Sequence, residues 1–443
     1  MENQTLNLKP IEHSERITAL DIMRGIVLCG ILLMNINGFG LAEAYSDPTV
    51  SGGATGWNLY TWITTNMLFE GTMRALFSLL FGVGMFILLD RMGKRHAGIK
   101  GADIYFRRLM WLLLFGIIHG YLLLWSGEIL YNYAIMGFLV YSFRNLTSRD
   151  LVIVAIILFS IGGIWNYFEY KGNVKMVEQA EMATAYKAEG KELTKDMKDA
   201  EKTWQEILER RSPESIATTN EGMTKSYLSA LAIVAPSTMH WKSYGLYRYD
   251  VWDILSMMLL GIALFKWNIL SGEKSVKFYA IMVVLGYLVG LTVNYFETIH
   301  IINNNFSYVS FQESNITYDL GRVPVAIGHI GLIMLFSKLK ILGWLKNAIS
   351  SVGKMALTNY LMHSVICMIV FTGAGFGMFG KLERYELIFV VVGIWIFQLI
   401  LSPIWLKYFH FGPAEWLWRR LSYLQSPPFK KMENIDVNTV IKY

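Results

Sequence analysis

The sequence has very few of the residues and motifs on which many enzymes depend. Its 443 residues include only two cysteines, Cys29 and Cys367. Both lie inside apolar segments, so we expect no disulfide framework, and the chain has no CxxC pair. It also contains no HExxH motif, no DxDxDG loop, no Walker A motif and no GxSxG elbow. We therefore expect no metal site, no NTPase-type phosphate loop and no hydrolase nucleophile elbow.

Charged residues are scarce as well. They make up 17% of the chain, compared with about 25% in average soluble proteins, whereas 54% of the residues are hydrophobic. This composition predicts an all-α, polytopic membrane protein, and we expect no nucleic-acid partner. No A-x-A-like site follows the first apolar run, so we expect the first span to be retained rather than removed as a signal peptide.

Ten apolar segments are long enough to cross a bilayer, for which about 17 to 25 residues are needed. They lie at 17–37, 68–90, 107–126, 128–143, 151–170, 251–267, 276–296, 321–341, 350–373 and 386–408. The sequence therefore predicts about ten transmembrane helices, and an even number of spans places both termini on one side of the membrane.

Lysine and arginine are nearly absent from one side of this predicted topology. With a cytoplasmic N-terminus, the short cytoplasmic segments hold 23 Lys or Arg residues and the short external segments hold two. The cytoplasmic segments are 1–16, 91–108, 144–149, 266–277, 338–354 and 407–443, and the external segments are 38–67, 127–128, 297–320 and 374–385. Because short cytoplasmic loops are enriched in positive residues, both termini are predicted to be cytoplasmic.

A long polar segment separates the predicted spans into two halves. Its Glu and Lys residues recur at helical spacing, with Trp204 and Leu208 among them. This pattern predicts one or two amphipathic surface helices, and a solvated linker fits the composition equally well. The stretch 226–249 contains Pro236 and is too short to span, so a re-entrant or interfacial segment is predicted. The predicted units are a membrane half at 1–170, an external insertion at 171–250, a second membrane half at 251–410 and a cytoplasmic tail at 411–443.

Nine ionisable side chains are predicted to lie within the spans, where such residues are costly and are often functional. They are Arg24, Glu70, Arg74, His119, Glu128, Asp253, Arg322, His329 and His363. In the predicted topology, most of them lie in the outer parts of their helices. The sequence therefore predicts a polar pocket that opens toward the outside.

Structural explanations compete with functional ones for the residues near the span ends. Glu70 and Arg74 are four residues apart and fit an ordinary interfacial ion pair. Glu128 and Asp253 lie close enough to the boundary to contact water. A substrate pocket and an interfacial layer of charges are both open interpretations here.

The histidines have the same two interpretations. His119 stands in an apolar run, so a core histidine that hydrogen-bonds a neighbouring helix competes with a catalytic base. His363 shares a helix face with Asn359, which favours a structural polar network. We place Asp21, at the start of the first span, in such a network too, paired either with Arg24 or with another helix.

Five stretches of the chain follow one another in a recognisable order: ERITALDIMRGIVLCGILLMNI, RALFSLLFGVGMFI, FRRLMWLLLFGIIHGYLLLWSGEILYNYAIMG, VGKMALTNYLMHSVI and GPAEWLWRRLSY. This order resembles that of the YeiB family of bacterial membrane proteins, whose C-terminal half is known as domain of unknown function 418. The L-D-x-x-R-G pattern also resembles, more distantly, a superfamily of transmembrane acyltransferases. The resemblance implies a multi-pass protein of the bacterial inner membrane and acyl transfer from a cytoplasmic donor such as acetyl-CoA.

The resemblance also implies roles for individual residues. One acyltransferase branch has an arginine followed eleven positions later by a catalytic histidine; Arg24 matches the arginine, but the eleventh position here is Asn35. Arg24 and Asn35 share one helix face, roughly 16 Å apart along the axis. The loop after Asn35 contains no histidine as far as residue 66. His119 is therefore the candidate base, with Glu128 orienting its ring and Asn35 donating to a developing oxyanion.

The remaining polar residues complete the predicted site. Arg24 would contact the phosphates of an acyl-CoA, and Arg74 and Arg322 would hold an anionic acceptor. The predicted acceptor site also includes Glu70, Asp253 and His329. The expected partners are the lipid bilayer and a small-molecule or envelope acceptor, with a homodimer as one expected assembly. Two other functions remain open: a transporter or exporter, in which these residues line a path, and an assembly protein, in which they fix packing.

Overall fold

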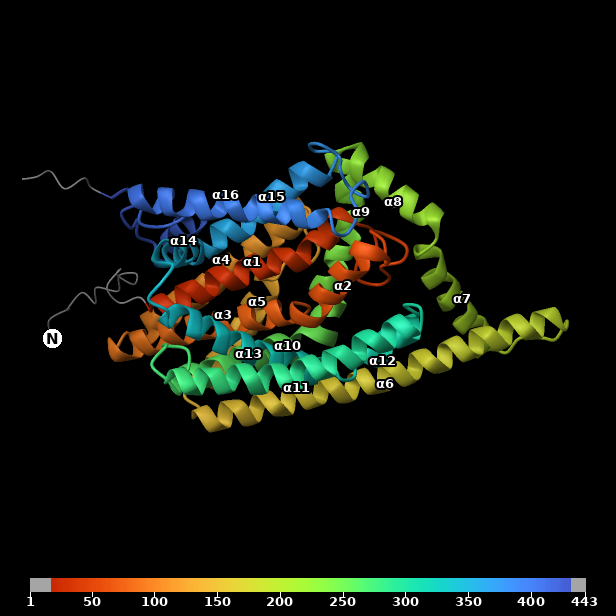
Figure 1. The fold of residues 1–443 in the computed structure, drawn as a ribbon, viewed down its shortest axis with the longest axis horizontal. Coiled ribbons are helices and arrows are strands. Elements are labelled where there is room, and N and C mark those ends of the chain that lie inside the picture. Colours follow the sequence, from red (N-terminus) through yellow and green to blue (C-terminus); the bar gives the residue numbers. More distant parts are fainter. Residues whose placement is uncertain (1–16, 432–443) are drawn as a thin grey trace, which may run out of the picture.

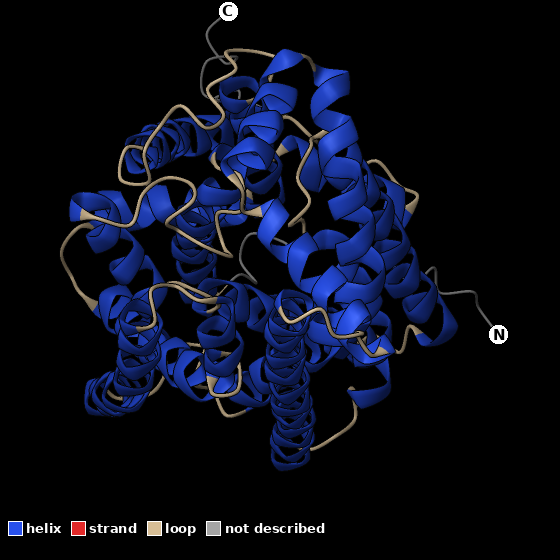
Figure 2. Cartoon of the chain, turned by 90° about the vertical axis from the view of Figure 1, so that its right-hand side faces the viewer, coloured by secondary structure: helices blue, strands red, loops and turns tan. Residues whose placement is uncertain are grey.

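The computed structural model describes residues 17–431, and residues 1–16 and 432–443, which contain parts of the predicted cytoplasmic segments, lie outside the described residues. The described chain is helical (Figures 1 and 2), and it contains no strand beyond one isolated bridge between Phe409 and Lys430. The helices are α1 (Thr18–Gly40), α2 (Gly56–Leu68), α3 (Thr72–Lys94), α4 (Gly98–Leu122), α5 (Leu130–Val140), α6 (Ser148–Ala188), α7 (Lys195–Arg210), α8 (Pro213–Lys225), α9 (Tyr227–His240), α10 (Val251–Lys266), α11 (Val276–Asn303), α12 (Tyr308–Ser314), α13 (Tyr318–Lys338), α14 (Gly343–Lys354), α15 (Ala356–Phe371), α16 (Leu387–Tyr408) and α17 (Pro413–Tyr423). A short 3₁₀ helix (Tyr141–Phe143) follows α5, and a π-helix (Trp241–Asp250) joins α9 to α10.

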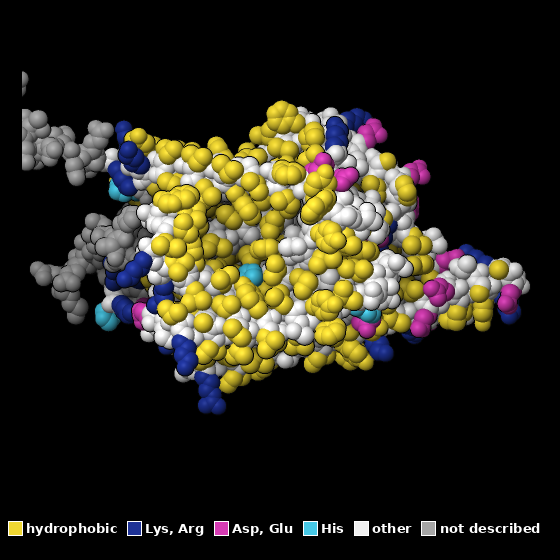
Figure 3. All heavy atoms as spheres, in the orientation of Figure 1, with side chains coloured by type: hydrophobic (Ala, Val, Ile, Leu, Met, Phe, Trp, Pro, Cys, Tyr) yellow, Lys and Arg dark blue, Asp and Glu magenta, His cyan; other side chains and the backbone are white. Residues whose placement is uncertain are grey.

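The flank of the bundle is apolar and its two ends differ in charge. Figure 3 shows hydrophobic side chains covering the flank, Lys and Arg gathered at its left-hand end, and Asp and Glu concentrated toward the right. The last turns of α3, α10 and α13 carry Lys94, Lys266 and Lys338. We call this end the basic end and the opposite one the far end. An apolar belt between two polar ends is the expected surface of a membrane protein.

Six helical stretches among residues 17–431 are long and apolar enough to cross a membrane. They are Thr18–Gly40, Gly56–Lys94, Ser148–Ala188, Val276–Asn303, Tyr318–Lys338 and Leu387–Tyr408. The pair α14 and α15 makes a seventh candidate if it counts as one broken span. The predicted all-helical, polytopic membrane architecture is therefore confirmed, whereas the count of ten is not established.

Three of the ten predicted spans fall on helices that are shorter or less apolar than a simple span. The prediction at 107–126 lies in α4, which carries Arg107 and Arg108. The predictions at 128–143 and 251–267 lie in α5 and α10, which have 11 and 16 residues. Helices of this length span only about 16 to 24 Å at about 1.5 Å per residue, less than the roughly 30 Å hydrocarbon core of a bilayer.

The predicted span at 350–373 contains a sharp bend. Its first residues belong to α14, and α14 meets α15 at an angle of 82°. The bend is stabilised from outside the pair, because the carboxylate of Glu415 on α17 accepts the backbone N–H groups of Leu357 (2.7 Å) and Thr358 (3.0 Å). These N–H groups belong to the first turn of α15, where they have no partner within the helix.

The helices are continuous on both sides of the predicted insertion. The predicted span at 151–170 continues without a break into the amphipathic region as the single 41-residue helix α6. Figure 1 shows the end of α6 and the following α7 projecting beyond the rest of the bundle. The stretch predicted as re-entrant or interfacial, 226–249, is helical from Tyr227 onward and continues into α10, with Pro236 accommodated inside α9.

Helix α1 is the centre of the packing. It contacts α3, α13, α14, α15 and α16, so the predicted N-terminal half is interleaved with helices of the predicted C-terminal half. Its closest neighbour is α14: a Cβ at Gly25 would lie 2.2 Å from the carbonyl oxygen of Ile349, and a Cβ at Gly353 would lie 1.9 Å from that of Asp21. The glycine of the L-D-x-x-R-G pattern therefore allows two backbones to approach closely.

Candidate functional site: two cavities and the polar clusters between them

The larger cavity lies at the basic end and has a volume of about 340 Å³. Such a volume is typical of sites for small organic ligands. Arg24, Arg108, Lys354 and Arg419 supply positive charge along its wall, where Asp21, Asp90 and Glu415 are the acidic residues. The deeper wall is apolar and aromatic; it includes Phe77, Leu80, Phe81, Leu130, Tyr133 and Tyr360. The cavity thus combines a cationic part with an apolar part.

Arg24 is held at this cavity by its own helix. Its Nη1 donates to Asp21 Oδ1 at 2.9 Å, and the Arg24 side chain remains 27% exposed while Asp21 is buried. The nearby Arg108 guanidinium stacks over the Trp418 ring at 3.6 Å, and no hydrogen-bond partner reaches its buried Nε within the described chain. Both arginines can therefore interact with an anion at the basic end.

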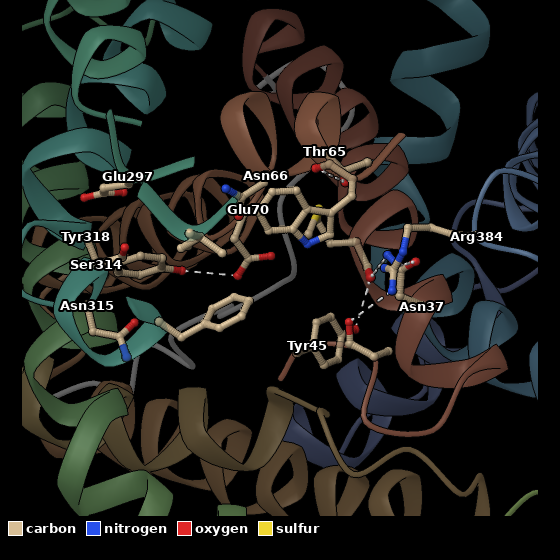
Figure 4. Close-up of a pocket in the computed structure, with 15 residues that line it drawn as sticks. Asn37, Tyr45, Thr65, Asn66, Glu70, Glu297, Ser314, Asn315, Tyr318 and Arg384 are labelled. Carbon is tan, nitrogen blue, oxygen red and sulfur yellow. Dashed lines mark hydrogen bonds between the residues drawn. The ribbon is translucent and has the colours of Figure 1, made fainter. Parts of the chain in front are cut away.

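A smaller cavity, of about 150 Å³, lies at the far end. Its wall carries polar side chains from several helices and loops: Asn37, Tyr45, Thr65, Asn66, Glu70, Glu297, Ser314, Asn315, Tyr318 and Arg384. Figure 4 shows Arg384 and Asn37 on one side of this cavity and Glu70, Glu297 and Tyr318 on the other, with the Glu70 carboxylate pointing into the space between. Helix α1 contributes residues to both cavities, because it runs from one end of the bundle to the other.

A charged cluster joins α3, α10 and α13. Asp253 lies between two arginines, with one oxygen 2.7 Å from Arg74 Nη2 and the other 2.7 Å from Arg322 Nη2. Arg74 also approaches Asp250 at 3.4 Å, and Arg322 pairs with Asp319. The Arg322 side chain is buried, whereas 35% of the Arg74 side chain is exposed. Three of the predicted substrate-binding residues are thus brought together, but their charges largely neutralise one another.

The charged cluster lies between the two cavities. The Arg74 backbone carbonyl accepts the hydroxyl of Tyr133 at 3.3 Å, and Tyr133 lines the basic-end cavity. On the other side, the Arg322 guanidinium lies 4.7 Å from the ring of Tyr318, which lines the far-end cavity. Tyr318 donates to Glu70 at 3.4 Å. One tyrosine therefore connects the cluster to each cavity.

A second cluster surrounds His119, which is fully buried. His119 Nε2 hydrogen-bonds the Ser364 hydroxyl at 2.6 Å, and its Nδ1 lies 3.9 Å from Glu128 Oε2. Glu128 forms an ion pair with Lys242 and accepts the backbone N–H of Leu130 at 2.8 Å. The predicted neighbours His119 and Glu128 therefore do lie side by side, at a distance slightly too long for a direct hydrogen bond.

Tyr360 connects this second cluster to the basic-end cavity. Its ring meets the His119 ring edge-on at a centroid distance of 4.9 Å, and Tyr360 also lines the cavity. Ser364 lies four residues after Tyr360, on the same face of α15. His119 is therefore next to the cavity wall and is shielded from the cavity by one aromatic side chain.

The other predicted site residues lie elsewhere. Asn35 lines neither cavity; its neighbours Met34 and Asn37 face the far-end cavity instead. His329 hydrogen-bonds Tyr287 at 2.8 Å between α11 and α13 and lines neither cavity. His363 and Asn359 form a polar network on α15, in which Gln398 bonds His363 Nε2 at 3.0 Å and donates to the Asn359 carbonyl at 3.0 Å.

The sequence resembles that of known proteins along almost its full length. Residues 264–425 match the family described as "Protein of unknown function (DUF418)". The protein YeiB of Escherichia coli (strain K12) is 30% identical over 425 residues, which cover 94% of this chain and 98% of the relative. The chain belongs to the YeiB family. A second relative, YxaH of Bacillus subtilis (strain 168), is 27% identical across 97% of this chain and 100% of its own length. Both relatives are described as uncharacterized, and no solved structure matches the chain.

The motifs by which the YeiB family is recognised lie around the basic-end cavity. Arg24 of the first motif borders it, and the adjacent Gly25 packs α1 against α14. Tyr360 of the fourth motif lies in its wall, and Glu415 of the fifth caps α15 beside it. Motifs far apart in the sequence therefore meet at one cavity.

Four further residues of this YeiB-family protein matter to the site, and three of them left no signal in the sequence. Asp250, Lys242 and Ser364 are partners of the predicted residues Arg74, Glu128 and His119, from which they are 176, 114 and 245 residues away in the sequence. Arg384 did leave a signal, because it is one of only two Lys or Arg residues in the predicted short external segments. Such an exception to the positive-inside pattern can mark a residue with a local role.

Proposed function

We propose that this protein is a transmembrane acyltransferase of the bacterial inner membrane. In this proposal about ten helices or half-helices cross the membrane, with the basic end and both termini in the cytoplasm. An acyl donor such as acetyl-CoA enters the basic-end cavity, and an acceptor approaches from the far end. The excess of Lys and Arg at one end supports the orientation, and relatives from two bacteria support the location.

The observation that carries the proposal is the pair of cavities at opposite ends of the same bundle. The basic-end cavity suits an acyl-CoA in its chemistry: Arg24, Arg108 and Lys354 would contact the phosphates, and the apolar wall at Phe77 and Leu80 would hold the acyl-bearing end. The bound donor supplies a thioester as the electrophile. The resemblance to transmembrane acyltransferases supports the same reading.

His119 is the proposed general base, and Glu128 orients it. In the transfer, the acceptor amine or hydroxyl attacks the thioester carbonyl, the new acyl bond forms, the C–S bond breaks, and the proton passes through His119 to the thiolate. His119 can do this only if Tyr360 moves from its position against the ring. Ser364, at 2.6 Å from Nε2, would hold the imidazole until then. Asn35 faces neither cavity, so its proposed oxyanion role has the weakest structural support.

The acyl-transfer proposal is tested with purified full-length protein and acetyl-CoA. We expect acetyl-CoA turnover in the wild-type protein and a decrease of about 10²- to 10⁴-fold in His119→Gln, which is the usual contribution of a general base. His329→Gln is the matched control, because His329 is also a hydrogen-bonded helix histidine but lines neither cavity. Equal turnover in both variants would remove His119 from the mechanism.

Donor binding has its own pair of variants. Arg24→Gln should weaken CoA binding about tenfold or more, since it removes a charged contact to phosphate. Lys94→Gln removes a positive charge from the same end, but the Lys94 side chain is 76% exposed and does not line the cavity. We expect it to leave CoA affinity nearly unchanged, and an equal loss in both variants would mean that binding depends on general surface charge.

A transporter or exporter is the second candidate, because of one observation. Arg74 is about one-third exposed within a charged cluster that lies between the two cavities, as expected of a residue beside a translocation path. Failure of CoA to bind the wild-type protein, together with substrate flux in proteoliposomes, would favour this function over acyl transfer. A purely structural role in a membrane assembly would give neither CoA binding nor flux.

A further inference from the structure

Arg384 is buried at the far-end cavity without a negative partner. Only 2% of the residue is exposed, and no carboxylate of the described chain lies within 4 Å of its guanidinium. Its Nη1 donates to the Asn37 side-chain oxygen at 3.1 Å and its Nη2 donates to the Ser51 carbonyl at 3.2 Å, while Nε has no hydrogen-bond partner. All of these partners are neutral. A full positive charge therefore remains uncompensated next to the cavity.

Burial without a counter-ion has a measurable consequence for this side chain. It lowers the pKa of Arg384 to about 10, which means that the surroundings disfavour the charged guanidinium. A buried charge is costly unless it is paired. An anion in the adjacent cavity would supply the missing partner.

The opposite wall carries two carboxylates that also lack an ion pair. Glu70 accepts only the Tyr318 hydroxyl at 3.4 Å, and Glu297 accepts the hydroxyl of Thr317. Among the described residues, no Lys, Arg or His lies within 4 Å of either carboxylate. Figure 4 shows these two glutamates across the cavity from Arg384. The cavity therefore has an arginine without a counter-ion on one side and two carboxyl groups without an ion pair on the other.

We propose that the far-end cavity binds a small zwitterion that carries both a primary ammonium group and a carboxylate. Its carboxylate faces Arg384 and its ammonium group faces Glu70 and Glu297. This assignment departs from the anionic acceptor expected at Arg74 and Arg322, because the carboxylates of the charged cluster already neutralise those two arginines. The cavity volume of about 150 Å³ limits the ligand to a compact molecule of amino-acid size.

Binding is inferred from the cavity alone, and a role for the zwitterion as acyl acceptor rests on the proposed function. In that role the ammonium group first gives one proton to Glu70 or Glu297, and the free amine then attacks the thioester carbonyl. An amide bond forms, the C–S bond breaks, and a second N–H proton passes through His119 to the departing thiolate. The product is an N-acyl amino acid, which has lost its ammonium charge. It would be held less well by Glu70 and Glu297, and this favours its release.

The first experiment uses the wild-type protein and a ligand series. Full-length protein in nanodiscs is titrated with glycine, β-alanine, 4-aminobutyrate and 5-aminovalerate, which keep both charges and differ in the distance between them. Butyrate and butylamine are the single-charge controls. We expect at least one zwitterion to bind about tenfold more tightly than both controls, since each control gives up one charged contact. If butylamine binds as tightly as every zwitterion, the cavity is a cation site and the proposal is wrong.

The second experiment assigns each charge to its residue. Arg384→Lys and Arg384→Gln should weaken the binding of the zwitterion and of butyrate but leave the binding of butylamine unchanged. Glu70→Gln and Glu297→Gln should instead weaken the binding of the zwitterion and of butylamine. Arg211→Gln is the control, because Arg211 already faces Asp47 at 3.6 Å and does not line the cavity. Equal effects of the Arg384 and Arg211 variants would overturn the assignment. If Arg384→Gln does not fold, Arg384→Lys can replace it because lysine keeps the positive charge. The ligand series on the wild-type protein tests the site without any variant.

The outcomes separate this inference from the proposed function. Zwitterion binding without acetyl transfer from acetyl-CoA would support the site and overturn acyl transfer. Acetyl transfer to an acceptor without a carboxylate, together with no zwitterion binding, would support acyl transfer and overturn the site. Formation of an N-acetyl amino acid that is lost in Arg384→Lys would support both.

Discussion

The two cavities differ in the way their charges are arranged. At the basic end, arginines and a lysine lie along one wall and an apolar, aromatic wall lies beyond them. At the far end, the cavity is less than half as large, and one arginine faces two glutamates across it. The first arrangement suits a long anionic molecule with an apolar part, and the second suits a compact molecule with two charges. One bundle thus presents two different chemistries at its two ends.

The comparison also shows what keeps the cavities apart. The charged cluster around Asp253 lies between Tyr133 on one side and Tyr318 on the other. It ties α3, α10 and α13 together through ion pairs. If this cluster is the barrier, weakening it should affect both cavities, whereas changes near one end should affect only that end.

The largest effect is expected for Asp253→Asn. The substitution leaves Arg322 buried and short of one carboxylate, and removal of one partner of a buried ion pair costs about 3 to 5 kcal/mol. We expect a large loss of unfolding free energy in detergent, measured by chemical denaturation, and weaker binding of ligands at both ends. Asp103→Asn is the control, since the Asp103 side chain is 56% exposed in its pair with Arg107; we expect a change below about 1 kcal/mol there. Equal losses in the two variants would show that Asp253 is not the centre of the barrier.

The charged cluster and the contact between His119 and Glu128 were partly predictable from the sequence. Arg74, Asp253 and Arg322 are unusual inside apolar segments, and helical spacing with the positive-inside pattern placed them at similar depth, where the structure brings them together. The proximity of His119 and Glu128 was predictable for a similar reason, since a short turn between two helices brings their ends together.

The rest depends on contacts that local patterns do not encode. Ser364 lies 245 residues from His119, and one serine in an apolar helix gives no signal of its partner. The angle between α14 and α15 depends on Glu415, which is 57 residues from the Thr358 N–H that it accepts. The role proposed for Arg384 depends on the absence of a nearby carboxylate, and only the folded structure shows this absence.

A substitution at Gly25 should separate the two cavities. Gly25→Ala places a Cβ 2.2 Å from the Ile349 carbonyl oxygen and pushes α14 away from α1, and overpacking of this kind costs about 1 to 3 kcal/mol. Helix α14 contributes Lys354 to the basic-end cavity and no residue to the far-end cavity. We expect weaker CoA binding, measured by isothermal titration, with unchanged zwitterion binding. Gly163→Ala is the control, because a Cβ there meets no atom within 4 Å. Unchanged CoA binding in Gly25→Ala would show that the spacing of α1 and α14 does not shape the basic-end cavity.

The smallest effect is expected at Glu415, on the edge of the basic-end cavity. Burial is the main influence on this carboxyl group and raises its pKa, although the hydroxyl and N–H groups of Thr358 and the N–H of Leu357 act in the opposite direction. A raised pKa means that the folded protein binds the proton more tightly than the unfolded chain, so stability falls as the pH rises from the ordinary pKa of glutamic acid, about 4.3, through the raised value. Glutamine does not titrate, so we expect the unfolding free energy of Glu415→Gln to change less with pH across this range. Just above pH 4 we expect it to differ from the wild-type value by less than about 1 kcal/mol. Parallel pH profiles for the two proteins would mean that the hydrogen bonds to α15 hold the carboxylate charged, and the bend between α14 and α15 would then depend on that charge.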